Sequence, residues 1–346
     1  MRVALTAFTR RGYLLARDLE QALQEWGEET VLALPARLAG TLAAPGYEGL
    51  SDWTGARFRD CGALLFVGAC GIAVRAIAPW VRDKFTDPAV VSVDEAGQWT
   101  VPLLSGHAGG ANTLARWVAK QTGGAAAVST ATDVNGRFAV DQWAIRQGLS
   151  LDSRKAAKQV SADLLAGDSV GLKSDFTLHG EWPKGLISGP AETGIAITLD
   201  PDAAPFQTTL RLFPPVLTLG IGCRRGIPSE AVCRAVERTL SSHHLARKAV
   251  FQISTIDLKR EEAGLLEFCR SWGVPLVTWT AAELAETAGE FTPSPFVRQV
   301  TGVDNVCERA AVRAGGRLLI RKESLEGVTV AVACRPWSIS FEEREE

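Results

Sequence analysis

A glycine-rich loop that contains one histidine is the stretch of this chain best suited to chemistry. Residues 105–112 read Ser-Gly-His-Ala-Gly-Gly-Ala-Asn, between an apolar strand predicted over 101–104 and a helix that continues to residue 120. The first N–H groups of a helix have no partner within it, so such a loop can bind an anion or a polarised oxygen. His107 could supply a base near neutral pH. Alternatively, Gly109 and Gly110 make a tight turn and His107 hydrogen-bonds to a backbone carbonyl.

Two further loops in this part of the chain follow predicted strands. One is Gly68–Gly71 with Arg75 close behind, and the other is Thr130–Gly136. In open α/β sheets, ligands bind at the carboxyl ends of the strands, so the sequence predicts that these loops and the histidine loop converge there. Each loop alone is also compatible with an ordinary turn or helix start. The predicted substrate-binding residues of the three loops are Gly68, Gly71, Arg75, Ser105, Gly109, Gly110, Asn112, Thr132 and Asp133.

Patterns for nucleotide and metal sites are absent from the sequence. Gly68–Gly71 lacks the dinucleotide pattern G-x-G-x-x-G, and no G-x-x-x-x-G-K-[ST] phosphate loop occurs, so a nucleotide-binding protein is disfavoured. The seven cysteines include no C-x-x-C pair, and the four histidines have no metal-ligand spacing. We therefore expect no protein-bound metal and no disulfide framework.

A second polar set lies in the last third of the chain. Gly222-Cys223-Arg224-Arg225-Gly226 places two arginines between a predicted strand and a helix, and arginine can bind carboxylates or phosphates through two hydrogen bonds. The alternative is that these arginines are merely solvated. A second cluster could form from charged residues after later strands and in a later helix, although such residues often just face solvent. Its members are Asp257, Lys259, Glu308 and Lys322.

The overall composition is that of a globular protein without general affinity for polyanions. The 346 residues are 46 % hydrophobic and 22 % charged, with a formal net charge of −2. That charge attracts neither nucleic acid nor anionic membranes, so an anionic ligand must be bound by local basic clusters. The sequence shows no signal peptide, and its longest uncharged run, 61–74, is too short to span a bilayer. We expect a soluble cytoplasmic protein.

The order of predicted elements indicates an α/β protein in three segments. Strands alternate with amphipathic helices over residues 1–148 and again over 214–346, which predicts two mostly parallel sheets covered by helices. Residues 149–213 have short strands separated by a Gly/Pro-rich stretch and are predicted to form a small α+β middle unit. Pro214-Pro215 marks the second boundary.

These motifs, in this order, resemble the cobalt-precorrin-5A hydrolase family of the anaerobic cobalamin pathway. Residues 68–75, 93–95, 102–112 and 132–133 are similar to its amino-terminal domain. Residues 220–226, 256–259, 301–311 and 327–333 are similar to its carboxyl-terminal domain, which also occurs alone in the aerobic pathway. The most specific stretch is Leu-Ser-Gly-His-x-Gly-Gly-Ala-Asn, and the resemblance is weak between about 150 and 213.

The resemblance implies a substrate and a reaction. The substrate is a cobalt-containing contracted tetrapyrrole whose ring-A acetate is closed as a δ-lactone. Hydrolysis opens the lactone and expels the extruded meso carbon with its methyl group as acetaldehyde, giving cobalt-precorrin-5B. Cobalt would arrive with the substrate, so no cofactor is expected.

Roles follow for the residues singled out above. His107 would deprotonate the attacking water, N–H groups around Gly109–Ala111 would stabilise the oxyanion, and Glu308 and Lys259 are the candidate acid–base partners for carbon–carbon cleavage. Arg224, Arg225, Asp257 and Lys322 would contact the substrate, and the two arginines would bind the carboxylates of the macrocycle. Transient contact with neighbouring pathway methyltransferases and a homodimer are compatible with this role. The rival hypothesis is a carrier that passes tetrapyrrole intermediates between methyltransferases without chemistry.

Overall fold

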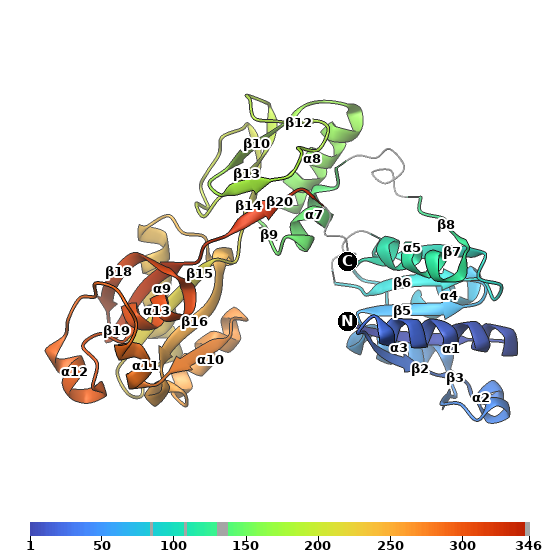
Figure 1. Ribbon diagram of the computed structural model, residues 1–346, viewed down its shortest axis with the longest axis horizontal. Helices are drawn as coiled ribbons and strands as arrows, with labels where there is room; N and C mark the ends of the chain where they lie inside the picture. Colours follow the sequence, from blue (N-terminus) through green and yellow to red (C-terminus); the bar gives the residue numbers. More distant parts are fainter. Residues whose placement is uncertain (84–85, 107–108, 130–137, 343–346) are drawn as a thin grey trace. The chain divides into compact units, whose positions relative to one another are not determined.

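The chain divides into two compact units, Met1–Gln142 and Trp143–Glu346. The structure is a computed structural model that describes residues 1–83, 86–106, 109–129 and 138–342 (Figure 1). Each unit is described by itself below. Among the described residues, no helix is both long enough and apolar enough to cross a membrane.

The first unit is built on a six-stranded sheet in the order β2-β1-β5-β6-β7-β8. Its strands are β1 (Arg2–Ala7), β2 (Glu29–Leu32), β5 (Ala63–Val67), β6 (Ala89–Val93), β7 (Trp99–Leu104) and β8 (Ala125–Ala126). Its helices are α1 (Arg10–Glu25), α2 (Ala36–Leu42), α3 (Leu50–Asp60), α4 (Cys70–Ile77) and α5 (Ala111–Thr122), and a small pair comprises β3 (Leu34–Pro35) and β4 (Gly46–Tyr47).

The central strands of this sheet are buried on both faces, as the sequence predicted. Leu65 of β5 packs in the cluster formed with α1 and α5, whereas its neighbours Leu64 and Phe66 pack in the cluster formed with α4. Successive strand residues point to opposite faces, so a continuous apolar run is needed where helices cover both. β1, β2, β5 and β6 are parallel, but β7 is antiparallel to β6.

The second unit contains two five-stranded sheets. Helix α7 (Val140–Arg146) spans the boundary between the units, and the sheet that follows has the order β12-β10-β13-β14-β9. Its strands are β9 (Ser150–Leu151), β10 (Val170–Ser174), β12 (Leu186–Ile187), β13 (Thr193–Ile197) and β14 (Thr208–Phe213). This segment also contains helix α8 (Arg154–Ala166) and strand β11 (Thr177–His179), which lies outside the sheet. All pairs are parallel except β14 with β9, so the middle unit is more regular than its sequence suggested.

The carboxyl-terminal sheet has the order β17-β16-β15-β19-β18. Its strands are β15 (Leu217–Cys223), β16 (Val250–Ile256), β17 (Leu276–Trp279), β18 (Arg317–Leu325) and β19 (Val328–Cys334). Its helices are α9 (Ser229–Ser242), α10 (Ala263–Trp272), α11 (Ala281–Ala285), α12 (Pro295–Thr301) and α13 (Cys307–Gly315), with 3-10 turns η1 (Arg247–Ala249) and η2 (Asp257–Lys259). β15, β16 and β17 are parallel, and β19 is antiparallel to β15.

Helices cover both faces of the carboxyl-terminal sheet as well. α9 and α10 contribute to the large apolar cluster on one face, and α13 packs on the other. A Cβ atom at Gly220 would lie 1.8 Å from the carbonyl oxygen of Cys307, so glycine is required where α13 lies against β15. The sequence therefore correctly predicted an α/β protein with mostly parallel sheets.

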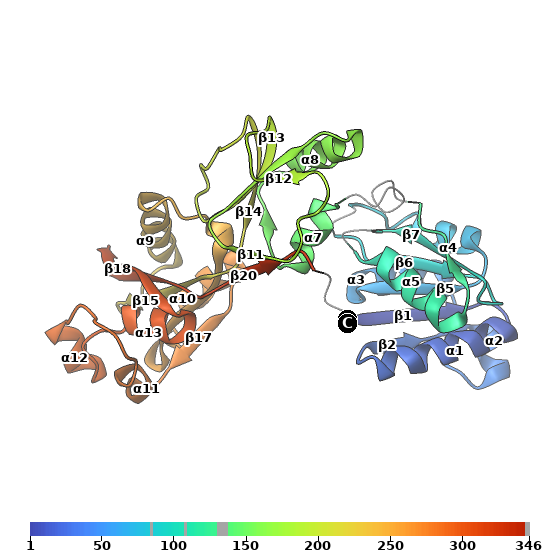
Figure 2. The same cartoon turned by 45° about the horizontal axis from the view of Figure 1, so that its top comes forward.

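The last strand of the chain returns to the middle unit. β20 (Ser338–Ser340) pairs in parallel with β11 (Figure 2). The indole N–H of Trp143 donates to the carbonyl of Ser340 at 3.0 Å, and the ring of Phe341 stacks on Trp143 with centroids 5.1 Å apart. The middle unit is thus connected to the carboxyl-terminal domain twice. The chain runs from β14 into β15 at the start of that domain, and β20 pairs with β11 after its end.

Candidate functional site

The glycines of the histidine loop are each required by the conformation that the loop adopts. A Cβ atom at Gly109 would lie 2.4 Å from Cβ of Ser105, and one at Gly106 would lie 2.7 Å from Oδ1 of Asn112. Gly110 has a φ of 84°, a left-handed conformation that disfavours other residues, and it is the N-cap of α5. These three positions explain why the loop is so rich in glycine.

Ser105 and Asn112, two of the predicted binding residues, are buried within the loop and do not face solvent. Ser105 is 7 % exposed and its hydroxyl donates to the carbonyl of Asp87 at 2.9 Å, while Asn112 is 1 % exposed at the start of α5. The N–H groups of Gly109 and Ala111 both donate to the carbonyl of Ser105, at 3.1 and 3.2 Å. They are not available to an oxyanion in this conformation, which corrects that part of the prediction.

The predicted convergence of the loops is wrong for two of them. Gly68, Gly71 and Arg75 follow β5, at the carboxyl ends of the parallel strands. Because β7 runs in the opposite direction, the loop after it lies where those strands begin, and a Cβ atom at Gly109 would be 3.3 Å from the backbone nitrogen of Ala89. Arg75 is exposed, with Nη1 3.5 Å from the carbonyl oxygen of Gly71.

His107, Thr132 and Asp133 lie outside the described residues. Their predicted roles therefore remain predictions. What the structure does establish is the frame on either side of His107, formed by Ser105 and Gly109.

Part of the polar set of the carboxyl-terminal domain, the arginine pair with Asp257 and Lys259, gathers at one edge of its sheet. β15 and β16 are parallel, so the residues after them, Arg224–Gly226 and η2, lie at the same edge. The hairpin turn between β18 and β19 lies beside Cys223 of β15, because Cys223 pairs with Val328. Strand direction thus brings residues from four strands together where ligands bind in α/β sheets.

A partly buried carboxylate connects two of these segments, and sequence inspection had not singled it out. Glu262, whose side chain is 9 % exposed, accepts a hydrogen bond from the backbone N–H of Gly226 at 2.7 Å and one from Nζ of Lys259 at 2.8 Å. Burial alone would raise the pKa of Glu262, but these hydrogen bonds outweigh it and lower the pKa, so the carboxylate is ionised at neutral pH. Lys259 is therefore held in an ion pair.

The two arginines are presented to solvent. Both are exposed, and neither forms an ion pair with any described residue. The backbone N–H of Arg224 donates to the carbonyl of Gly327 at 3.1 Å, and its Cδ lies 2.9 Å from where a Cβ of Gly327 would be. Glu326 and Gly327 both have positive φ, as a tight hairpin turn requires. Gly327 thus makes room for Arg224.

The proposed acid–base role of Glu308 is not supported by its position. Glu308 is fully buried, and its carboxylate accepts hydrogen bonds from N–H and Oγ1 of Thr292 and from N–H of Lys322 at 2.7, 2.9 and 2.8 Å. Nζ of Lys322 donates to the carbonyl of Thr292 at 3.0 Å. Both predicted site residues therefore hold the segment around Thr292 to β18, and the Glu308 carboxylate has no access to a substrate.

This structural role predicts a loss of stability when Glu308 is replaced with Gln. The amide nitrogen would face an N–H donor and leave it unsatisfied, at a cost of about 1–3 kcal/mol in the free energy of unfolding. Urea denaturation measures the change, and Glu267→Gln on the exposed face of α10 serves as the control. A variant with unchanged stability but lost activity would return Glu308 to the catalytic role.

The thiol at this edge is a poor candidate for a nucleophile. Burial raises the pKa of Cys223 to about 11, with Lys259 opposing that rise. A thiol with this pKa is neutral at pH 7, whereas reactive cysteines are thiolates. The chemistry at this edge is therefore that of cations and hydrogen-bond donors.

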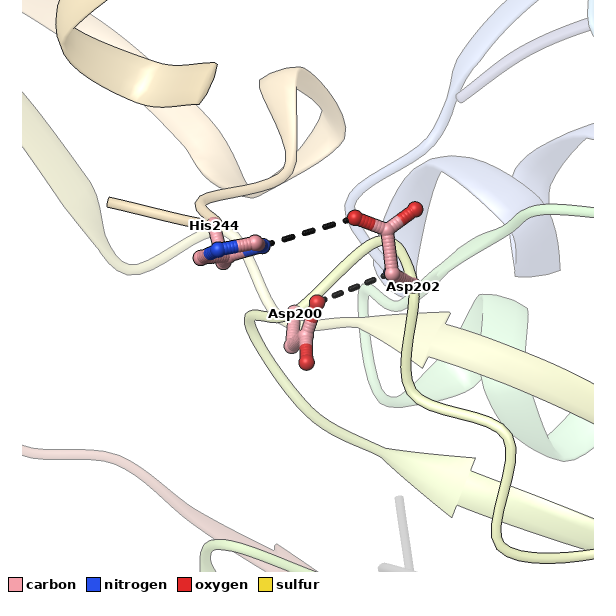
Figure 3. A group of neighbouring side chains, drawn as sticks. All are labelled: Asp200, Asp202 and His244. Atoms are coloured by element: carbon pink, nitrogen blue, oxygen red, sulfur yellow. Dashed lines mark hydrogen bonds and ion pairs between the residues drawn. The ribbon is translucent and has the colours of Figure 1, made fainter. Parts of the chain in front are cut away.

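Among the described residues, the fold brings together one group of side chains of the kinds that bind metals (Figure 3). Asp200, Asp202 and His244 have donor atoms within 4.8 Å of one another, and Nδ1 of His244 lies 3.5 Å from Oδ2 of Asp202. The side chains of His244 and Asp202 are 71 % and 77 % exposed. An ion pair and a backbone hydrogen bond from Asp202 to Asp200 account for this arrangement without a metal.

We accordingly expect the purified protein to contain less than one equivalent of zinc, iron or cobalt. Exposed side chains such as those of Asp202 and His244 compete poorly with water for a metal ion. No described cysteine belongs to a group of potential metal ligands. Elemental analysis after dialysis against a chelator tests this expectation. One equivalent of metal that survives chelation and disappears in His244→Ala would contradict it.

Comparison with known families gives the site its context. Three family models match successive parts of the chain: "Cobalamin synthesis G N-terminal" over 52–133, "Cobalamin biosynthesis central region" over 138–214 and "Cobalamin synthesis G C-terminus" over 217–333. The chain belongs to the cobalamin synthesis G family. The histidine loop lies in the first matched region of this family, and the arginine pair lies in the third.

Relatives within the cobalamin synthesis G family are named as enzymes. Cobalt-precorrin-5A hydrolase of Salmonella typhimurium is 38 % identical over 78 % of this chain and 81 % of its own length, and that of Priestia megaterium is 32 % identical over 81 % and 80 %. A crystal structure of a cobalamin biosynthesis protein G homolog from Sulfolobus solfataricus matches at 19 % identity, covering 96 % of both chains, with a TM-score of 0.43. The chain is therefore an enzyme, a hydrolase of cobalamin biosynthesis.

Proposed function

We propose that this protein is a cobalt-precorrin-5A hydrolase, which opens the ring-A acetate δ-lactone of its substrate and releases acetaldehyde. The observation that carries this proposal is the 38 % identity to the Salmonella typhimurium enzyme of that name over most of both chains. The product of the reaction would be cobalt-precorrin-5B. Cobalt enters the site as part of the substrate, so the protein needs no metal or cofactor of its own.

The carboxyl-terminal edge suits the charge of this substrate. The macrocycle carries several acetate and propionate groups, and Arg224 and Arg225 present guanidinium groups that lack a carboxylate partner among the described residues. Arginine binds carboxylates through two parallel hydrogen bonds. A protein with a net charge of −2 needs such local cations to bind a polyanion.

The histidine loop is proposed to activate water. His107 would take a proton from the water as its oxygen bonds to the lactone carbonyl carbon, giving a tetrahedral oxyanion. Gly110 N–H, next to the start of α5, bonds to no acceptor among the described residues, whereas the N–H groups of Gly109 and Ala111 are occupied. We assign the oxyanion contact to Gly110 for this reason.

Collapse of the oxyanion breaks the acyl–oxygen bond and leaves a carboxylate on ring A and an alkoxide on the extruded carbon. The alkoxide then forms the carbonyl group of acetaldehyde as the bond between that carbon and the macrocycle breaks. The electron pair of this bond passes to the macrocycle, which takes up a proton. Lys259, held by Glu262, is not free to donate that proton without breaking its ion pair.

Acetaldehyde release is the direct test of the proposal. The purified protein is incubated anaerobically with the cobalt-containing lactone, and acetaldehyde is measured by coupled reduction with alcohol dehydrogenase. We expect catalytic turnover, with loss of the lactone by mass spectrometry. Stoichiometric binding of the lactone without acetaldehyde would favour the carrier hypothesis instead.

A further inference from the structure

Glu262 connects two segments that carry predicted substrate contacts. It is the N-cap of α10, and its two carboxylate oxygens point to different partners: Oε1 accepts from Gly226 N–H at 2.7 Å and Oε2 accepts from Lys259 Nζ at 2.8 Å. Gly226 ends the loop that carries Arg224 and Arg225, and Lys259 ends η2, which begins at Asp257. One side chain therefore sets the spacing between the two segments.

The surroundings of Glu262 make this connection rigid. Its side chain is 9 % exposed and that of Lys259 is 17 % exposed, so water competes weakly for their hydrogen bonds. Gly226 has a φ of 73° and packs against no atom within 4 Å of its absent Cβ. Gly226 is itself exposed, so the hydrogen bond from its N–H to Glu262 is a contact that packing does not duplicate on that side. Loss of the acceptor is therefore expected to loosen the arginine loop at this end.

We propose that Glu262 is a positioning residue for substrate binding, which holds the arginine loop in the geometry that receives the carboxylates of the macrocycle. Glu262 does not contact the substrate and acts through Arg224 and Arg225. This inference rests on the proposed function, because it takes a tetrapyrrole polycarboxylate as the ligand. It adds to that function a role for the Glu262 carboxylate, which orients Arg224 and Arg225 toward the carboxylates of the substrate.

Gly327 supports the same loop from the other side. It accepts the backbone N–H of Arg224 at 3.1 Å, and its missing Cβ leaves room for the side chain of Arg224. The loop is thus held at its first residue by Gly327 and at its last by Glu262. Removing Glu262 frees one end only, so we expect the loop to loosen and the domain to remain folded.

The experiment measures binding of dicyanocobyrinic acid, a corrin with free carboxylates, and of its methyl ester, by quenching of tryptophan fluorescence. Glu262→Ala and Glu262→Gln are compared in the wild-type protein and in the Arg224→Ala/Arg225→Ala background. Glu261→Gln is the matched control, since Glu261 is the exposed neighbour. Circular dichroism confirms that each variant is folded.

Glu262→Ala is expected to weaken binding of the acid about 10- to 100-fold, by analogy with the loss of a residue that orients a metal ligand. Glu262→Gln retains an acceptor for Gly226 and should fall between Glu262→Ala and the wild type. Neither variant should change binding of the ester. In the background without the two arginines, neither should weaken binding of the acid further, because the groups through which Glu262 acts are absent.

Two results would overturn the inference. An equal loss for acid and ester, or an equal loss with and without the arginines, would show that Glu262 only maintains the fold. If Glu262→Ala does not fold, Glu262→Gln carries the same comparison. The probe has no lactone, so failure of the proposed reaction appears separately as absence of acetaldehyde from the wild-type protein.

Discussion

Replacing His107 with Ala is expected to slow acetaldehyde release about 10²–10⁴-fold, which is the usual contribution of a general base. Substrate affinity should change little, because the carboxylate contacts are assigned to the carboxyl-terminal domain. The variant leaves Gly106, Gly109 and Gly110 in place, and these determine the conformation of the loop. Single-turnover kinetics with the cobalt-containing lactone separates the chemical step from binding.

His179→Ala is the control for this experiment. The side chain of His179 is exposed on β11, and the contact that the residue makes with Phe341 goes through its backbone carbonyl. A His107→Ala variant that binds poorly but converts bound substrate at the wild-type rate would make His107 a recognition residue. The base would then have to be sought elsewhere, with Asp133 the first residue to replace.

Replacing Arg224 and Arg225 together with Ala is expected to weaken substrate binding about 10²–10⁴-fold, if each loses one charge-assisted hydrogen bond of about 1.5–3 kcal/mol. The melting temperature should hardly change, because exposed cations without a partner contribute little to folding. Fluorescence titration and thermal denaturation give the two quantities.

Arg270→Ala provides the matched control, since Arg270 is an exposed arginine of α10 in the same domain. The salt dependence of binding adds a second measurement. Wild-type affinity should decline as ionic strength rises, and the double variant should show a shallower decline. Unchanged affinity in the double variant would mean that the two arginines are only solvated.

The local pattern of the sequence predicted much of the secondary structure. The apolar run that forms β5 and the 3-to-4-residue spacing of Leu114, Trp117 and Val118 in α5 depend only on neighbours along the chain. Such elements can be recognised because the period of buried residues is a property of each segment by itself.

Burial and partners across the chain could not be predicted in the same way. Glu308 was chosen as a charged residue in a predicted helix, and its sequence surroundings gave no sign that Thr292 and Lys322 hold its carboxylate. Glu262 meets Gly226 across 36 residues, and His244 approaches Asp202 from a different element. These pairs exist only in the folded chain, because their members belong to different elements.

The sequence by itself determined the family, the alternation of strands and helices, and the residue types that could bind carboxylates or activate water. The tertiary structure decided which of them share an edge. Arg224, Lys259 and Glu262 come together because β15 and β16 are parallel, whereas Gly71 and Ser105 are separated because β7 is antiparallel to β6. Strand direction decides which end of the sheet a loop reaches, and it is set by pairing between segments distant in the chain.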